Sequence, residues 1–191
     1  MGKTETAGMF ARLGIPVYDA DAAVHRLYAP GGGAVAAIAV TFPCCVKDGA
    51  VDRTCLSEKV RDDAAALARL EAVVHPLVAR EREDFIAHAA AQGSDMIILD
   101  IPLLFETGGD TTVDAVVVVT APEELQRARV LSRPGMSEEL FGQIISRQLP
   151  DVDKRRRADF VVETDKGLSH AFEQVKQIVS VLRARQRGVN A

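Results

Sequence analysis

The chain has 191 residues, 48% of them hydrophobic and 26% charged, which is enough to bury the core of one domain. Its formal net charge of −4 argues against nucleic acid as the main partner, and no apolar run reaches membrane-spanning length. The 3 cysteines, two of them adjacent, make a poor disulfide framework and lack metal-ligand spacing, so we expect reduced thiols and a cytoplasmic protein.

The front of the chain contains part of a phosphate-binding motif. Gly2-Lys3-Thr4 fits the last three positions of the loop G-x-x-x-x-G-K-[ST], and residues 5–13 are predicted to form the helix that such a loop opens. An ordinary basic N-terminus would explain the tripeptide equally simply. Because the loop normally follows an apolar strand and a first glycine, we expect both to be encoded upstream, with Met1 as an internal residue of the loop.

Two carboxylates follow the first predicted strand, at 15–18. Asp19 and Asp21 stand where this strand gives way to a helix, and ligands bind at the carboxyl ends of strands in open α/β sheets. A helix N-cap would explain one of the two aspartates but not both. The glycine-rich stretch 30–33 lacks the spacing of a dinucleotide fingerprint and is predicted to be a loop.

The next region is predicted to be mostly helical. We expect helices over 34–42, 53–61, 64–74 and 77–92. A turn or hairpin is expected over 44–52, around Asp48-Gly49, and His75-Pro76 is expected to break the helical pattern. Such a block suits a substrate-covering region, in which His75 fits a structural role better than that of a base.

Residues 96–100 form the clearest predicted strand, a continuous apolar run typical of a parallel sheet buried on both faces. The strand ends in Asp100, and an acid in this position commonly helps to hold Mg²⁺ in enzymes that transfer phosphoryl groups. Pro102 is predicted to stop the strand. Leu103 then belongs to the core or to the wall of a substrate pocket, and Glu106 either faces solvent or contacts substrate.

The rest of the chain alternates strands with helices. Strands are predicted over 113–120 and 160–162, and helices after Pro122 and over 137–148, 151–158 and 168–187. Arg133 and Arg147 flank one of these helices. The alternation predicts a single α/β domain with a parallel sheet and right-handed crossovers.

Several motifs are specific only in combination. They are Gly2-Lys3-Thr4, Asp19-Ala20-Asp21, Leu-Glu-x-x-x-His-Pro at 70–76, Asp-x-Pro-Leu-Leu-Phe-Glu at 100–106, Arg147-Gln148 and Ala158-Asp159-Phe160-Val161-Val162. In this order they closely resemble the dephospho-coenzyme A kinase family over nearly the whole chain.

The resemblance implies a P-loop kinase fold in one domain, 1–191, with a helical CoA-binding region at about 30–92 and a lid at about 133–157. Its parallel core would have five strands, of which the first, central strand is missing here. The implied reaction is ATP-dependent phosphorylation of the ribose 3′-hydroxyl of dephospho-CoA, with Mg²⁺, by a cytoplasmic monomer or small homo-oligomer. No nucleic-acid or membrane partner is implied.

The resemblance also assigns residues. Lys3 would reach the β- and γ-phosphates, Thr4 and Asp100 would hold Mg²⁺, Asp100 through water, and Asp19 would accept the hydroxyl proton unless Asp21 takes that role. The expected catalytic residues are Lys3, Asp19, Asp21 and Arg133. The expected ATP contacts are Gly2, Lys3, Thr4, Glu5, Arg133, Arg147, Thr164 and Asp165. The expected substrate contacts are Asp19, Asp21, His75, Asp100, Leu103 and Glu106.

Two alternatives remain at this point. In the first alternative, the chain is another small-molecule P-loop kinase that acts on a nucleoside or a small alcohol. The Leu-Leu-Phe and His-Pro runs argue against this alternative. Otherwise it is a non-catalytic or degraded copy that keeps only the binding of a CoA-type ligand. Because a parallel sheet without its middle strand loses two ladders of hydrogen bonds, we also expect these 191 residues alone to be poorly stable and nearly inactive.

Overall fold

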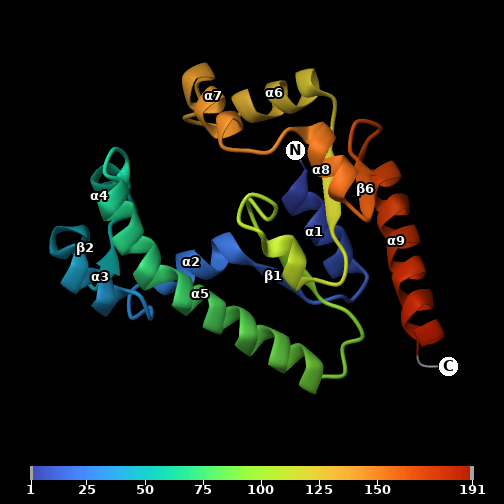
Figure 1. The fold of residues 1–191 in the computed structure, drawn as a ribbon, viewed down its shortest axis with the longest axis horizontal. Helices are drawn as coiled ribbons and strands as arrows, with labels where there is room; N and C mark the ends of the chain where they lie inside the picture. The colour runs from blue at the N-terminus through green and yellow to red at the C-terminus, as the bar shows by residue number, and fades with distance from the viewer. Residues whose placement is uncertain (1, 190–191) are drawn as a thin grey trace. The chain divides into compact units, whose positions relative to one another are not determined.

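The computed structural model describes residues 2–189, and the chain divides into two compact units (Figure 1). Unit 1 comprises residues 1–17 and 102–191, and unit 2 comprises residues 18–101. Met1, which the expected upstream loop includes, lies outside the described residues. Over residues 2–189, no helix combines the length and the apolar composition needed to cross a bilayer.

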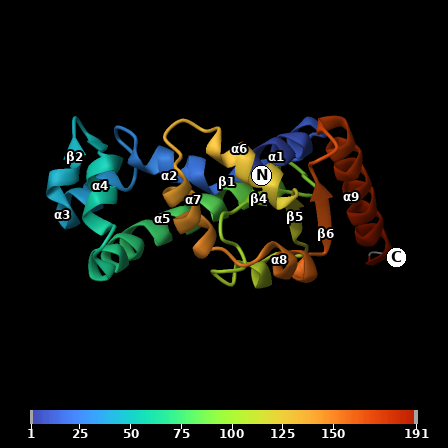
Figure 2. The same ribbon diagram turned by 90° about the horizontal axis from the view of Figure 1, so that it is seen from above.

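Unit 1 contains one N-terminal helix and the C-terminal half of the chain. Its elements are α1 (Lys3–Arg12), η2 (Gly109–Thr112), β5 (Val117–Thr120), α6 (Glu123–Leu131), α7 (Glu138–Ser146), α8 (Asp151–Arg157), β6 (Phe160–Glu163) and α9 (Leu168–Val189). Strands β5 and β6 lie side by side and pair in parallel, with Val117 opposite Phe160 and Thr120 opposite Glu163 (Figure 2). This pairing confirms the predicted parallel arrangement.

The interior of unit 1 is built from aliphatic side chains. Helices α1 and α9 pack on each other, with Met9 of α1 and Val175 of α9 almost completely buried. At their edge the Arg12 guanidinium lies over the Phe172 ring, 5.0 Å from its centroid. A second cluster joins Phe105 to the buried Val118 of β5 and to Val116, which directly precedes that strand.

Unit 2 contains the helical region. Its elements are β1 (Val17–Asp19, starting at the unit boundary), α2 (Ala20–Tyr28), α3 (Val35–Thr41), η1 (Pro43–Cys45), β2 (Val46–Lys47), β3 (Ala50–Val51), α4 (Arg53–Val60), α5 (Ala64–Ala91) and β4 (Ile98–Asp100). β1 and β4 are neighbours in one sheet, and β2 and β3 form an antiparallel hairpin. The expected Asp48-Gly49 turn is confirmed, since both residues take the positive φ that a tight hairpin requires, 51° and 75°.

The strands of the described residues form two-stranded sheets, not the single five-stranded sheet that the resemblance implies. The strands are only two to four residues long, and each is hydrogen-bonded to one neighbour. Each unit therefore holds its short sheet in place by helix packing more than by an extended hydrogen-bond ladder.

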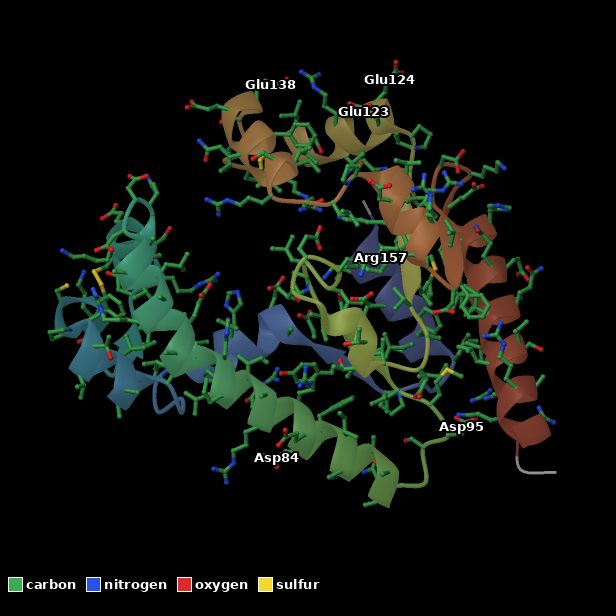
Figure 3. All side chains as sticks on the ribbon, viewed as in Figure 1. Asp84, Asp95, Glu123, Glu124, Glu138 and Arg157 are labelled. Atoms are coloured by element: carbon green, nitrogen blue, oxygen red, sulfur yellow. A yellow bond between two sulfur atoms is a disulfide. The ribbon has the colours of Figure 1, made fainter. Side chains whose placement is uncertain are left out.

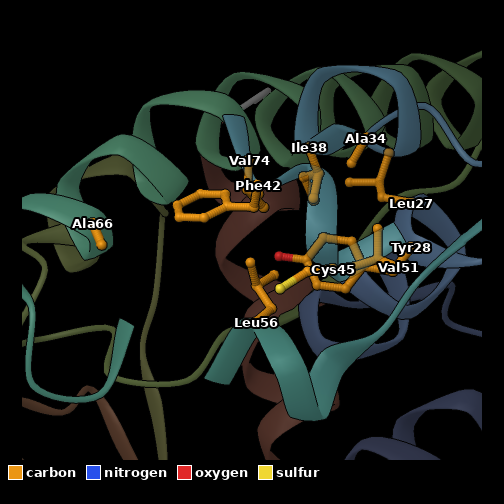
Figure 4. Packing of buried hydrophobic residues seen from close by; sticks show 10 residues of the cluster. All are labelled: Leu27, Tyr28, Ala34, Ile38, Phe42, Cys45, Val51, Leu56, Ala66 and Val74. Atoms are coloured by element: carbon orange, nitrogen blue, oxygen red, sulfur yellow. The ribbon is translucent and has the colours of Figure 1, made fainter. Parts of the chain in front are cut away.

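The core of unit 2 lies under α5. Figure 4 shows the apolar side chains that meet there, among them Ile38 of α3, Leu56 of α4 and Val74 of α5. The prediction that Pro76 breaks this helix is wrong, because α5 runs unbroken from 64 to 91 with Pro76 inside it. Proline removes one backbone hydrogen bond, and the burial of Val74 with the partly buried Leu77 on the same core offsets that loss.

The prediction of reduced cysteines is also wrong for two of the three, since Cys45 and Cys55 form a disulfide with Cα atoms 5.3 Å apart. Only Cys44 is a free thiol. The β2–β3 hairpin turns the chain back, so residues ten apart in sequence become neighbours. Counting cysteines in sequence could not show this return.

Candidate active site

The phosphate-loop residues lie at the start of α1 in unit 1. Gly2 is the N-cap residue, in the left-handed region at φ 94°, and its carbonyl accepts a hydrogen bond from the Thr6 N–H at 2.8 Å. Lys3 is half-buried, whereas Thr4 and Glu5 are exposed. The first N–H groups of a helix and its dipole attract anions, so this end of α1 suits a phosphate.

Thr164, the residue that follows β6, packs against Gly2. A Cβ atom at Gly2 would lie 3.3 Å from the Thr164 methyl carbon, so both the positive φ and the close approach require glycine here. The Thr164 hydroxyl donates to the carbonyl of Thr120 at 3.1 Å. From α6, Arg129 donates to the Thr164 hydroxyl at 2.9 Å and to its carbonyl at 2.8 Å. Thr164 is thus fixed as a support for the loop residue.

Asp165 and the end of β5 complete this edge of the sheet. Asp165 is exposed beside the buried Thr164. The buried Thr120 donates its hydroxyl to both carboxylate oxygens of Asp151, at 2.9 Å each, and so joins β5 to the start of α8. The carboxyl ends of the two parallel strands therefore carry a continuous polar network beside Gly2.

Arg133 and Arg147 follow α6 and α7, and both are exposed. Helices α6 and α7 contact each other, and Arg127 of α6 forms an ion pair with Glu138 at the start of α7. Glu138 is labelled in Figure 3, together with Glu123 and Glu124 at the start of α6. The two predicted phosphate-binding arginines thus each follow the C-terminal end of a helix in the same segment, and both side chains are exposed.

Glu106 anchors the segment that follows α7. Its Oε1 accepts a hydrogen bond from the Leu149 N–H at 2.6 Å and lies 3.4 Å from the Lys154 ammonium. Burial by itself would raise the pKa of Glu106, but the Leu149 hydrogen bond and the Lys154 charge outweigh burial and hold the pKa below its usual value. The predicted substrate contact of Glu106 stays a prediction, and the bonds that the structure gives this carboxylate are structural.

Arg157, at the end of α8, forms a second tertiary contact in this part of unit 1. Arg157, which Figure 3 labels, donates to Asp110 of η2 at 2.6 Å and lies over the Phe105 ring, 4.5 Å from its centroid. The basic helix α8 is therefore partly occupied with contacts inside its own unit.

In unit 2, Asp19 and Asp100 are the last residues of neighbouring strands. Asp19 is the N-cap of α2, and its Oδ1 accepts from the Ala22 N–H at 2.9 Å, which leaves Oδ2 for a further hydrogen bond. Asp21 lies exposed in the first turn of α2, whereas Asp100 is buried. The Asp100 carboxylate is a hard oxygen donor of the kind that Mg²⁺ prefers, and the Thr4 hydroxyl of unit 1, taken by itself, is another, so the chemistry of each residue fits that ion.

Two predicted substrate contacts are exposed. His75 lies on the solvent side of α5, which agrees with its weak case as a base. Leu103 is a non-glycine residue at φ 53°, and its carbonyl accepts from the Thr107 N–H at 3.0 Å in the turn after β4. A leucine held in this strained region with 39% of its surface exposed is unusual in a fold that buries its apolar residues, and such strain gathers at ligand sites.

Three residues of this polar network, Arg129, Thr120 and Asp151, are not among the predicted site residues. Thr120 could have been found, since it ends a buried strand as Asp100 does. Arg129 carried no such signal, because one arginine on an amphipathic helix usually faces water. Its partner Thr164 is 35 residues away in sequence.

Comparisons with known proteins agree on one family. The family model described as "Dephospho-CoA kinase" matches residues 1–170. A dephospho-CoA kinase of Mesorhizobium japonicum is 53% identical over 188 residues, which cover 98% of this chain and 94% of the relative. One from Cereibacter sphaeroides is 51% identical over 183 residues, covering 96% and 91%.

Solved structures are similar as well. A crystal structure of a Thermus thermophilus protein superposes with a TM-score of 0.82 at 32% identity, covering 94% of this chain and 91% of the other. The dephospho-CoA kinase from Campylobacter jejuni superposes with a TM-score of 0.63 at 20% identity, covering 94% and 90%, which supports the fold.

The first prediction concerns Arg129. Arg129→Met keeps the length of the side chain but removes both hydrogen bonds to Thr164, so the support behind Gly2 loosens. We expect ATP binding, measured by calorimetry, to weaken about tenfold, the equivalent of one or two hydrogen bonds. Arg127→Met is the matched control on the same helix, because its exposed ion pair contributes little. Equal affinities in the two variants would remove Arg129 from this role.

The second prediction concerns Glu106. Because its pKa is lowered in the folded state, its carboxylate stabilises the fold fully above the ordinary value of about 4.3, and this contribution is lost as the pH falls through the lower folded value. We expect Glu106→Gln to reduce the free energy of unfolding by about 1–2 kcal/mol at pH 7, since a charged acceptor is replaced by a neutral one.

The same difference should disappear in acid, once Glu106 itself is protonated. Urea unfolding at neutral pH and at a pH well below 4 measures both values. Glu58→Gln, an exposed glutamate on α4, is the control and should change neither. A loss that is equally large at both pH values would show that charge is not the cause.

Proposed function

The chain belongs to the dephospho-CoA kinase family, and on that premise we propose how its residues divide the work of phosphorylating dephospho-CoA with ATP. The reaction transfers the γ-phosphoryl group of ATP to the ribose 3′-hydroxyl and yields coenzyme A. The observation that carries the function is the 53% identity with a curated kinase over 98% of this chain. The alternatives of a different small-molecule kinase or a binding-only copy are not favoured.

Residues at the start of α1 bind the phosphates in this proposal. The N–H groups of the first turn and the Lys3 ammonium neutralise the charge of the transferring group, and Glu5 borders the same turn. Gly2 allows the close packing on Thr164 that supports it. Thr4 and Asp100 would hold Mg²⁺, Asp100 through water, and the ion would supply positive charge to the transferring phosphoryl group.

Asp19 is the proposed proton acceptor for the 3′-hydroxyl. Its Oδ1 is committed to the Ala22 N–H, so Oδ2 is the atom that takes the proton. Because the N-cap hydrogen bond fixes one carboxylate oxygen, the orientation of the other oxygen is fixed as well. Such an orientation suits a group that must be held in place to accept a proton. Asp21, which lies two residues further on in the first turn of α2 and is exposed, is proposed to contact substrate or metal-bound water.

The remaining assignments concern the ends of the two substrates. We propose that residues at about 133–157 act as a lid, in which Arg133 and Arg147 hold phosphates and exclude water during transfer. Thr164 and Asp165 border the nucleotide. The helical region at about 30–92, which includes His75, binds the CoA portion of the substrate. Leu103 makes an apolar contact with that portion, and Glu106 lies at its edge. The cytoplasm is the proposed compartment, because the reaction consumes ATP.

A substrate panel tests the function. The full chain is assayed with ATP and Mg²⁺ on dephospho-CoA, on several nucleosides and on small alcohols. We expect turnover of dephospho-CoA alone. Turnover of a nucleoside would favour the other kinase class, and calorimetric binding of dephospho-CoA without ATP binding would favour a binding-only protein.

The third prediction concerns Lys3. Lys3→Ala removes charge from the transferring phosphate without removing core packing. We expect kcat to fall roughly 100- to 1,000-fold while the melting temperature stays near that of the parent. Lys176→Ala, whose ion pair with Glu173 on α9 is exposed, is the control and should keep its activity. A Lys3→Ala variant with near-parental kcat would exclude Lys3 from the transfer step.

The fourth prediction separates the two roles of Asp19. Asparagine caps a helix about as well as aspartate, so Asp19→Asn should keep the fold while lowering kcat roughly 100-fold or more. Asp19→Ala should also lose about 1 kcal/mol of stability with the cap. Both are measured by steady-state kinetics and thermal unfolding.

Asp21→Asn provides the comparison for this pair. We expect it to affect kcat less than Asp19→Asn does. A larger effect at Asp21 would reverse the two roles, and parental kcat in both variants would reduce the pair to a helix cap and its exposed neighbour.

A further inference from the structure

Three sulfur atoms gather in the helical region of unit 2, and none of them has a role in the reaction steps described above. The Sγ atoms of Cys44, Cys45 and Cys55 all lie within 4.8 Å of one another. The Cys44 Sγ is 3.8 Å from that of Cys45 and 4.0 Å from that of Cys55, while the latter two are joined as a disulfide. A free thiol is therefore in reach of both atoms of a disulfide.

The three cysteines are held together by the backbone as well as by the disulfide. The Asp52 N–H donates to the Cys45 carbonyl at 2.8 Å, and the Asp52 carboxylate accepts from the Cys55 N–H at 3.0 Å. Lys47 closes the hairpin through its 2.7 Å ion pair with the same carboxylate. These contacts do not involve sulfur, so the three thiols stay close when the disulfide is reduced.

Access to solvent differs among the three. Cys44 is exposed, Cys55 is half-buried, and Cys45 is completely buried in the apolar cluster of unit 2 (Figure 4). A reagent from solution thus meets Cys44 first and cannot reach Cys45 directly. Figure 3 shows a disulfide as a yellow bond in the part of the structure that holds β2 and α4.

Two of the three cysteines have a positive charge or a helix dipole near the sulfur atom. Cys55 lies in the first turn of α4, where the helix dipole stabilises a negative sulfur. The Lys47 ammonium is near enough to Cys44 for their charges to interact, and the pKa of Lys47 is raised, first by its hydrogen bond to Asp52 and in small part by Cys44. Both features are typical of exchange-active cysteines.

We propose that Cys44 is a thiol-modification site that takes up a low-molecular-weight disulfide from solution and passes the oxidation to the Cys45–Cys55 pair. Because two of the three sulfur atoms are already bonded to each other in the structure, disulfide exchange fits the cluster better than metal binding by three thiolates. The reactant is any small disulfide RSSR whose two halves leave as thiols.

The exchange balances in three displacements. The Cys44 thiolate attacks RSSR, forms a mixed disulfide and releases one RS⁻. The Cys55 thiolate attacks the Cys44 sulfur, forms a Cys44–Cys55 bond and releases the second RS⁻. The Cys45 thiolate then attacks the Cys55 sulfur, which forms Cys45–Cys55 and returns Cys44 as a thiolate. In sum, two cysteine thiols are oxidised to one disulfide, and RSSR is reduced to two RSH.

A time course with glutathione disulfide tests this sequence. The full chain is reduced completely, freed of reductant and mixed with glutathione disulfide at neutral pH. Samples are quenched in acid, free thiols are blocked with N-ethylmaleimide, and the disulfides are mapped by mass spectrometry. We expect a Cys44–glutathione adduct that rises and then decays as Cys45–Cys55 accumulates. A persistent adduct without transfer, or a first adduct on Cys55, overturns the proposal.

Two variants and a control sharpen the test. Cys44→Ser should form Cys45–Cys55 roughly tenfold more slowly or worse, since only the half-buried Cys55 remains to receive glutathione. Cys45→Ser should stop at a Cys44–Cys55 disulfide. Ser57→Ala, on the exposed side of α4, should behave as the parent. Oxidation of Cys44→Ser at the parental rate refutes the role of Cys44, and the parental time course decides the order of events even if Cys45→Ser unfolds.

Discussion

The parallel pairing of β5 with β6 is the constraint on which the phosphate side of the site depends. It brings Thr164 beside Thr120, so that both the N–H and the hydroxyl of Thr164 donate to one Thr120 carbonyl, at 3.0 and 3.1 Å. Arg129 clamps Thr164 from the other side, and Gly2 packs on its methyl group. A shift of one strand would therefore displace the glycine before Lys3 as well as the strand end.

The acidic residues near strand ends divide into two kinds by what their oxygens already bind. Asp19 uses only Oδ1 for its helix cap, and Oδ2 stays available for chemistry. Glu106 uses Oε1 for the Leu149 N–H and the Lys154 ammonium, and this explains both its lowered pKa and its bonds across 43 residues. Carboxylates are thus proposed to act in catalysis at Asp19 and are engaged in tertiary structure at Glu106.

Unit 2 shows how short elements can be stabilised without a large sheet. Asp19, Asp52 and Asp63 each cap a helix by accepting a hydrogen bond from a backbone N–H two or three positions into it. These local bonds position the helices over a common apolar core, and packing on that core keeps α5 helical through Pro76. The hairpin between α3 and α4 brings the cysteines together as a by-product of the same packing.

Local pattern alone predicted much of this protein. Apolar runs and turn residues located the parallel strands β5 and β6, the Asp48-Gly49 hairpin and the helix that starts at Lys3, because these features depend on neighbours in sequence. Only the tertiary structure decided that α5 continues through Pro76, that Cys45 bonds to Cys55, and that Arg129 supports Thr164. Each of these outcomes depends on contact with a side chain that is distant in sequence. The spacing of apolar residues within one segment carries no information about such a contact.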